Sequence, residues 1–432
     1  GPYMLVLLVG TGIYFTFRTN FLQVRKFIYT MSNTLMKIFH KDDKALDGDI
    51  TPFQALATAL AATIGTGNIA GVATAIALGG PGAIFWMWVS AFFGMMTKYA
   101  EVVLAVHYRE KNQEGNWVGG PMYYISNGLN MKWLGIVFSI FGALAAFGIG
   151  NMVQSNSVAA AMESSFNIPP IATGLILAVG AGLVILGGIK RIALVTEKIV
   201  PIMAVFYIVG ALVILVLNFS GIPTAFGLIF SSAFSPKAAV GGFAGATVMQ
   251  AMTRGIARGV FSNEAGLGSA PIAHAAARTD HPVRQALWGI FEVFADTLVI
   301  CTLTALTILS TGVWDSGITG AALTTEAFNV GLPGSGGIIV AIGILFFAFS
   351  TILSWAYYGE KCAEHIFGSK VNKIYRYVWI PLIVVGSIGS LELIWDVADT
   401  LNGLMAIPNL VGLLGLSGLV IKLTKEFFET KA

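Results

Sequence analysis

Two glycine-rich stretches that contain polar residues decide how this chain folds. The first reads Ala61-Ala-Thr-Ile-Gly-Thr-Gly-Asn-Ile-Ala-Gly71, and the second reads Arg258-Gly-Val-Phe-Ser-Asn-Glu-Ala-Gly-Leu-Gly-Ser269. Each lies in a predicted membrane span. Glycine lowers helix propensity, and backbone groups that leave a helix inside lipid find no water to bind. The sequence therefore predicts that both stretches line a polar cavity.

The composition around these stretches is that of a membrane protein. Of 432 residues, 56% are hydrophobic and 11% are charged, and the mean hydropathy is +0.78. A soluble domain carries roughly 25% charged residues, so this chain has too little polar surface for one. The net charge of +3 is small and its basic residues are scattered, which argues against a nucleic-acid partner. The two cysteines form no disulfide framework or metal motif.

Apolar runs of about twenty residues divide the chain into eleven predicted transmembrane helices. The spans are 2–18, 52–78, 82–107, 133–161, 169–188, 193–218, 239–275, 284–311, 335–359, 373–390 and 391–423. We therefore expect an all-α polytopic membrane protein in which residues 1–432 form one transporter domain.

The distribution of basic residues gives this membrane protein an orientation. With the N-terminus outside, the cytoplasmic segments hold 22 of the 25 lysines and arginines. Cytoplasmic loops carry such an excess in membrane proteins. We therefore expect a cell (inner) membrane protein with its C-terminus in the cytoplasm. Residues 18–51 mix basic and apolar positions, and are interpreted either as an amphipathic helix on the cytoplasmic leaflet or as an ordinary loop.

The two interruptions occur five spans apart. Paired interruptions of this kind are typical of transporters built from two inverted repeats, with the binding site at the breaks. The first repeat would be 52–218 and the second 239–423, while residues 1–51 stand outside. The alternative for either glycine cluster alone is close helix packing. Glu264 favours the site, because an ionisable group at membrane depth is costly.

A broken helix offers its own backbone to a ligand. Free N–H groups at the start of a half-helix suit a carboxylate, and free carbonyls suit an ammonium group or a sodium ion. We therefore expect Thr66, Gly67, Asn68 and Gly71 to bind the substrate, with its carboxylate at the first three. Its amino group is expected at carbonyls of the second stretch, which are those of Phe261, Ser262 and Asn263. A zwitterion fits both sets.

Five motifs resemble those of the alanine or glycine:cation symporters. They are Gly67-Asn-Ile-Ala-Gly-Val-Ala, Gly79-Gly-Pro-Gly-Ala-Ile-Phe-Trp-Met-Trp, Met95-Met-Thr-Lys-Tyr-Ala-Glu101, Phe261-Ser-Asn-Glu-Ala-Gly-Leu-Gly-Ser-Ala-Pro-Ile-Ala-His-Ala-Ala-Ala and Ser350-Thr-Ile-Leu-Ser-Trp-Ala-Tyr-Tyr-Gly-Glu360. The resemblance implies a LeuT-type fold of 5+5 inverted repeats plus one extra N-terminal helix. It also implies sodium coupling and alanine or glycine as substrate.

The resemblance further implies a sodium site. It would combine the carbonyls of Ala61 and Ile64 with the hydroxyls of Ser350 and Thr351. The alternative is that these hydroxyls bond back to the preceding helical turn, as is common in membrane helices.

Several polar and aromatic residues have two interpretations each. Asp296 either completes a second ion site with Asn68 and Ser262 or pairs with Arg254 or Arg258. Gln154 either reaches the ligand or bonds a neighbouring helix. Aromatic side chains at the breaks either cap the pocket or only pack, and these are Phe261 and Trp355.

Charged residues suggest a gate. Arg254 and Arg258 lie before the second break and are expected to meet Asp396 or Asp399, either as an extracellular gate or as static ion pairs. Lys98 and Glu101 are expected to reach the cytoplasmic interface by snorkelling.

The function expected from these residues is secondary active transport of a small neutral amino acid by sodium symport, through alternating access. Proton coupling through Glu264 or Asp296 is one alternative, and a channel is another. No catalytic motif and no cofactor is predicted, and the expected partners are alanine or glycine, sodium and the lipid bilayer.

Overall fold

The computed structural model describes residues 2–37, 47–234, 248–389 and 391–429, without the side chains of residues 2 and 391–396. Asp396 therefore lies outside the described side chains. Helices make up most of the described chain. A two-stranded hairpin joins β1 (Glu110–Lys111) to β2 (Trp117–Val118).

The helices follow one another with short connections. In chain order they are α1 (Pro2–Arg18), α2 (Leu22–Arg25), α3 (Phe27–Asn33), η1 (Leu35–Lys37), α4 (Pro52–Thr63), η2 (Gly67–Gly71), α5 (Val72–Gly79), α6 (Ala83–His107), α7 (Pro121–Tyr123), η3 (Tyr124–Gly128), α8 (Lys132–Ala145), η4 (Ala146–Met152), α9 (Val153–Phe166), α10 (Pro170–Ile185), α11 (Gly188–Leu217), η5 (Phe219–Gly221), α12 (Ile222–Phe234), α13 (Val248–Asn263), α14 (Pro271–Ala275), α15 (Pro282–Val293), η6 (Phe294–Cys301), α16 (Thr302–Ser310), η7 (Val313–Asp315), α17 (Gly320–Gly331), α18 (Gly336–Phe367), α19 (Val371–Ile388), α20 (Leu391–Gly415) and α21 (Ser417–Glu429).

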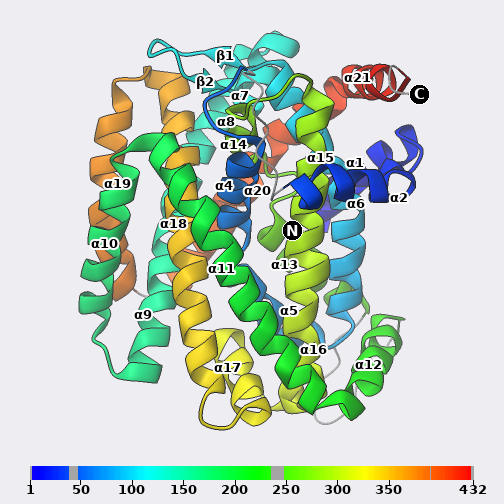
Figure 1. Ribbon diagram of the computed structural model, residues 1–432, viewed down its shortest axis with the longest axis vertical. Helices are drawn as coiled ribbons and strands as arrows, with labels where there is room; N and C mark the ends of the chain where they lie inside the picture. The colour runs from blue at the N-terminus through cyan, green and yellow to red at the C-terminus, as the bar shows by residue number, and fades with distance from the viewer. Residues whose placement is uncertain (1, 38–46, 235–247, 390, 430–432) are drawn as a thin grey trace.

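The long helices run along one axis of the molecule and form a bundle (Figure 1). The hairpin and α21 lie towards one end of the bundle, and α12 and α17 lie at the other. Apolar side chains hold the bundle together, because its larger buried cluster extends from Leu8 in α1 to Phe427 in α21.

Six helical segments of the described chain are long and apolar enough to cross a membrane, and one bent helix pair makes a seventh candidate. The chain is therefore a multi-pass membrane protein. Each of the eleven predicted spans contains a helix. In four of these spans the helix is shorter or less apolar than the seven candidates. The count of eleven stays a prediction.

The observed helices depart from the predicted spans in two places. The span 391–423 is divided, since α20 ends at Gly415 and α21 begins at Ser417. The helices α12 and α17 are additional, and both are shorter than a membrane-spanning helix. The predicted amphipathic segment after Arg18 is helical at α2 and α3, and residues 38–46 of it lie outside the described residues.

Small residues let the central helices approach closely. The helix α6 packs against both α13 and α15. At the contact with α13, a Cβ atom at Gly255 would overlap the Ala83 carbonyl oxygen. This glycine therefore serves close helix packing, the role that small residues commonly have between membrane helices. Tight packing here brings the end of α13 close to the middle of the bundle.

Candidate substrate and ion site at two broken helices

The first break separates α4 from η2. Thr51 and Gln54 form a capping box at the start of α4, and the helix ends at Thr63. The chain then bends by 49° before it continues as a π-helical turn and α5. The Asn68 Oδ1 atom accepts a hydrogen bond from the Gly65 N–H at 2.9 Å, which holds the break open. The interruption predicted around Gly67 is therefore present, between Thr63 and Gly67.

The second break is longer and follows α13. Glu264 has φ +56°, and Gly266 and Gly268 have φ +93° and +83°. A non-glycine residue seldom adopts this left-handed conformation, and it marks strained or functional backbone. Regular helix resumes only at α14. The interruption predicted near Asn263 thus begins one residue later, because Asn263 is still the last helical residue of α13.

The two breaks face each other across a small enclosed space. A Cβ atom at Gly67 would lie 3.2 Å from the Ser262 Cα atom and 3.3 Å from the Phe261 Cδ1 atom. The cavity beside them has a volume of about 10 Å³. That is room for about one water molecule, so in this conformation the space is too small for an amino acid. Its lining residues are Ala62, Thr63, Gly65, Thr66, Gly67, Ile149, Gln154, Phe261, Glu264, Thr351 and Trp355.

Polar groups in this cavity are available to a ligand. The Gln154 Oε1 atom accepts the Thr66 N–H over a long 3.5 Å, and the buried Thr66 hydroxyl has no hydrogen-bond partner within the described residues. The Trp355 indole N–H donates to a Glu264 carboxylate oxygen at 2.8 Å. Gln154 and Trp355 therefore both line the cavity, and Gln154 also makes the bond to a neighbouring helix that the alternative interpretation expects.

The predicted sodium ligands lie together beside the first break. The Thr351 hydroxyl donates to the Ala61 carbonyl at 2.9 Å, and the Ser350 hydroxyl donates to the same carbonyl at 3.2 Å. Both hydroxyls also bond back to Phe347, so the alternative interpretation describes part of their bonding. Neutral oxygen atoms of this kind suit a hard monovalent cation. The carbonyl of Ile64 makes no hydrogen bond to either hydroxyl.

Asp296 joins the two broken helices. Its Oδ1 atom accepts from the Asn68 amide at 2.6 Å and from the Ser262 hydroxyl at 3.1 Å. Its Oδ2 atom accepts from Thr297 at 2.7 Å. The alternative pairing of Asp296 with Arg254 or Arg258 was wrong, because Asp296 points between the breaks, where its partners are amides and hydroxyls.

π-helical turns place several of these side chains. Among the described helices, η2 carries Asn68, η6 carries Asp296, and η4 leads directly to Gln154. A π-turn inserts one extra residue into a helix and turns the following side chains, which is why such turns are frequent at functional sites. Hydrophobic periodicity does not reveal them.

The arginines before the second break lie in different surroundings. Arg258 lies 3.8 Å from Asp399, and its guanidinium covers the Phe261 ring at 5.5 Å. Arg254 is exposed. The predicted contact between Arg258 and Asp399 is therefore present, whereas Arg254 does not share it.

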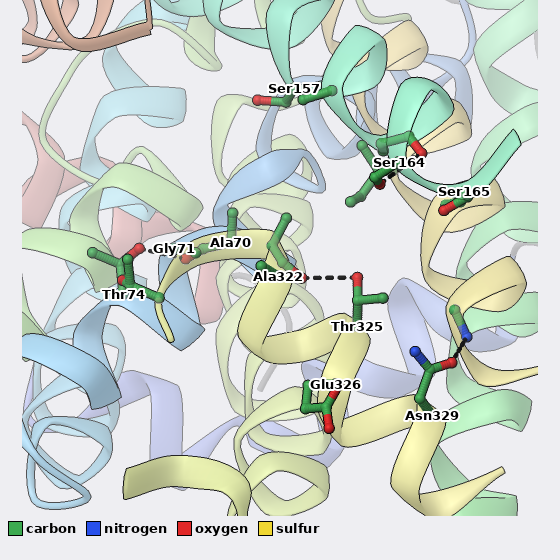
Figure 2. A pocket seen from close by; sticks show the side chains of 18 of the residues that line it. Ala70, Gly71, Thr74, Ser157, Ser164, Ser165, Ala322, Thr325, Glu326 and Asn329 are labelled. Carbon is green, nitrogen blue, oxygen red and sulfur yellow. Dashed lines mark hydrogen bonds between the residues drawn. The ribbon is translucent and has the colours of Figure 1, made fainter. Parts of the chain in front are cut away.

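A second, larger cavity lies beyond Arg258, next to α17 (Figure 2). Its volume is about 890 Å³, and hydroxyl and small side chains make up much of its wall, with Glu326 on α17. Gly71 lines this cavity and does not line the small one. Phe261 lines the small cavity and Arg258 the large one, so these two residues stand between them.

Lys98 and Glu101 are completely buried, so the predicted snorkelling was wrong. Lys98 forms an ion pair with Glu292 at 3.1 Å, and Glu292 also bonds His274. Glu101 accepts hydrogen bonds from the Gly266 N–H at 3.1 Å and from the Gly268 N–H at 3.0 Å. The predicted span 82–107 agrees with α6, and the burial of Lys98 and Glu101 instead follows from the helices that pack against α6, among them α13 and α15.

Paired broken helices that meet around a cavity, with carboxylate and hydroxyl groups at the breaks, are typical of membrane transporters. The fold and the site therefore indicate this class of protein. The described residues contain no cluster of three or more His, Cys, Asp or Glu side chains that could hold a metal ion.

Comparisons with known proteins give the family. The model of the sodium:alanine symporter family matches residues 1–432, and the chain belongs to this family. It is 55% identical to the sodium/alanine symporter AgcS of Methanococcus maripaludis, over all of this chain and 95% of that protein. It is 42% identical to the probable sodium/glutamine symporter GlnT of Bacillus subtilis, over 99% of this chain and 88% of that one. The resemblance drawn from the sequence motifs is confirmed.

A solved structure shares the fold. The manganese transporter of Eremococcus coleocola superposes with a TM-score of 0.53 at 15% identity, covering 88% of this chain and 82% of that chain. Since the identity is so low, this similarity concerns the fold alone.

Proposed function

We propose that this protein carries small neutral amino acids, with alanine or glycine as the substrate, in symport with sodium. The observation that supports this most is the meeting of the two breaks around one enclosed cavity. The N–H groups at Thr66 and Gly67 begin a half-helix and suit the substrate's carboxylate. The carbonyls at the end of α13 lack helical partners and suit its ammonium group.

The size of the cavity limits the substrate. A volume of about 10 Å³ does not admit even alanine, so binding must move side chains apart. Gln154 holds the Thr66 N–H only weakly, and a carboxylate would replace it as acceptor. Phe261 and Trp355 then leave room for a short side chain. We propose that these two bulky side chains limit the length of the substrate's side chain, so that alanine and glycine are preferred to larger amino acids.

Sodium is proposed to bind where the Ala61 carbonyl meets Ser350 and Thr351. A bound cation would be coordinated by the Ala61 carbonyl oxygen and by the two hydroxyl oxygens. The hydroxyls would then no longer donate to that carbonyl. Asp296, with Asn68 and Ser262, offers a second set of oxygen atoms closer to the second break. We propose that this second set also holds a sodium ion, because the buried carboxylate calls for a cation.

Alternating access follows from the closures on either side of the breaks. On the side of α17, Phe261 and Arg258 separate the small cavity from the large one. On the other side, Glu101 ties the second break to α6. We propose that the first closure opens outward and the second inward, with the basic end of the molecule in the cytoplasm. The two repeats of the fold would be 52–218 and 239–423.

Reconstituted vesicles test this proposal. Uptake of labelled alanine is measured with a sodium gradient, a potassium gradient or a pH gradient imposed separately. We expect accumulation only with sodium. Accumulation driven by the pH gradient alone would show proton coupling through Glu264 or Asp296, and equal uptake under all gradients would show facilitated diffusion.

A further inference from the structure

Residues 17–37 form a basic and apolar surface that the transport site does not use. In the sequence, residues 2–37 contain four basic residues and no acidic one. The basic residues are Arg18, Arg25, Lys26 and Lys37. Asp42 and Asp43, the next acidic residues, lie outside the described residues. A segment of this composition is attracted to a surface that carries negative charge.

Large apolar side chains are exposed on the same segment. Ile28 is 82% exposed and Val24 is 55% exposed, and Phe17 and Phe21 are also exposed. Apolar and basic groups that alternate on one short helical segment are typical of a helix lying in the membrane interface. Figure 1 shows α2 and α21 projecting from the same side of the bundle, near the end that carries the hairpin.

The helix α21 completes this surface. The Tyr29 ring meets the Phe428 ring with centroids 5.7 Å apart, and the Lys26 ammonium lies 5.2 Å from the centre of the same Phe428 ring. On α21 itself Lys422 pairs with Glu426 at 3.8 Å, and two lysines and two glutamates balance one another, so this helix adds aromatic contacts and no net charge. The two segments therefore present one surface, which we call the basic shelf: residues 17–37 and α21.

The basic shelf touches the helix that carries Asp296. The ring of Phe27 packs edge to face on the ring of Phe294, with centroids 5.2 Å apart. Phe294 is the first residue of the π-helical turn η6, and Asp296 follows two residues later. A displacement of α3 would therefore reach the proposed ion site through a single aromatic contact.

We propose that the basic shelf binds the headgroups of anionic phospholipids and that Phe27 transmits this binding to η6. The exposed apolar side chains enter the leaflet while the lysines and arginines meet the phosphates. Sodium-driven transport then depends on the anionic lipid content of the membrane. This dependence goes beyond the proposed function, and the binding itself can be measured without transport.

The binding is tested with charge-removing variants of the full chain. The triple variant R18Q/K26Q/K37Q removes three charges and leaves Arg25, whose guanidinium holds the turn at Asn20 through a 2.5 Å hydrogen bond. The control K132Q/K370Q/K373Q removes three exposed charges elsewhere. Retention of fluorescent phosphatidylglycerol by the purified protein is compared with that of phosphatidylcholine. We expect retention of phosphatidylglycerol by the shelf variant to fall about fivefold for each charge removed. Retention by the control variant should not fall. Equal retention by both variants would overturn the proposal.

The transmission is tested by uptake in vesicles with increasing phosphatidylglycerol. We expect the sodium concentration for half-maximal uptake to change several-fold with phosphatidylglycerol in the unchanged protein. F27A leaves the basic residues of the shelf in place and removes the ring that meets Phe294, so it should lose this response, and F27L, which keeps an apolar contact, should retain part of it. Lipid retention is measured for both variants, so that a change in binding is distinguished from a change in coupling. A full lipid response in F27A would overturn the coupling through Phe294.

Discussion

Both broken helices expose backbone groups inside the membrane, but side chains of different kinds bind the backbone at the two breaks. The first break is short and is held by neutral amides, since Asn68 bonds Gly65 and Gln154 bonds Thr66. The second break is longer, has three left-handed residues and is held by carboxylates, which are those of Glu101 and Glu264. Exposed backbone inside a membrane must find partners, and a longer break needs stronger ones. The contrast suggests that the first break receives the ligand and that the second is anchored to the bundle.

The carboxylate between the breaks gives the largest expected effect. Asp296→Asn removes the charge that receives hydrogen bonds from both Asn68 and Ser262. We expect sodium-driven alanine uptake to fall by about a hundredfold or more, as when one partner of a buried charge network is lost. Uptake in vesicles gives the measurement, and monodisperse elution from a sizing column shows that the variant is folded. Uptake within twofold of the unchanged protein would show that the Asp296 charge is not needed at the site.

Two glycines of the first break offer a matched pair. A Cβ atom at Gly67 would press against Ser262 and Phe261, whereas at Gly71 it meets nothing within 4 Å. We therefore expect Gly67→Ala to raise the KM for alanine by about tenfold, because overpacking costs roughly 1–3 kcal/mol. Gly71→Ala should leave KM nearly unchanged. Equal effects of the two substitutions would mean that the first break does not hold the ligand.

The hydroxyl beside the first break should control the response to sodium. Thr351→Ala removes one of the oxygen atoms at the Ala61 carbonyl, and Thr351→Ser keeps it. We expect the alanine variant to need about five to ten times more sodium for half-maximal uptake, which corresponds to roughly 1 kcal/mol for one lost contact. The serine variant should need nearly the normal concentration. If both variants respond alike, the hydroxyl does not bind the ion.

The anchor of the second break should affect speed and stability more than binding. Glu101→Gln weakens the bonds to the Gly266 and Gly268 N–H groups, and we expect the free energy of unfolding to fall by about 2 kcal/mol. The maximal rate should fall several-fold while the KM for alanine changes little. Thermal unfolding and uptake kinetics check both parts. A KM that rises in proportion would place Glu101 in the ligand site instead.

The smallest effect is expected at the ion pair between Arg258 and Asp399. The Arg258–Asp399 pair is partly exposed and 3.8 Å apart, and such pairs contribute roughly 0–1 kcal/mol. Uptake in Arg258→Ala and Asp399→Asn, singly and together, should fall less than about threefold. A double variant less impaired than the sum of the single effects would show that the two residues are energetically coupled. Full transport in all three would end the gate hypothesis.

The sequence was informative where the backbone itself carries the function. Gly65, Gly67 and Asn68 predicted the first break because their composition conflicts with a lipid-facing helix. The gathering of Ala61, Ser350 and Thr351 was implied by family resemblance, and physical pattern alone did not require it. Asp296 had two possible environments, and only the structure placed it between the breaks.

The surroundings of Lys98 and Glu101 were not predictable in the same way. Lys98 and Glu101 were placed at a membrane interface, since a charge near the apparent end of an apolar run usually lies there. Their burial depends on which elements pack around α6. This packing is a property of the tertiary structure, which the order of residues along one helix does not show. The π-helical turns were missed for a related reason, because one extra residue in a helix leaves no signature in composition.

The most direct measurement is an experimental structure of this protein with alanine and sodium bound. We expect density for alanine between the Thr66 and Gly67 N–H groups and the end of α13, with sodium at the Ala61 carbonyl and the Thr351 hydroxyl. Alanine bound only in the large cavity next to α17, with the space between the two breaks still closed, would contradict the account.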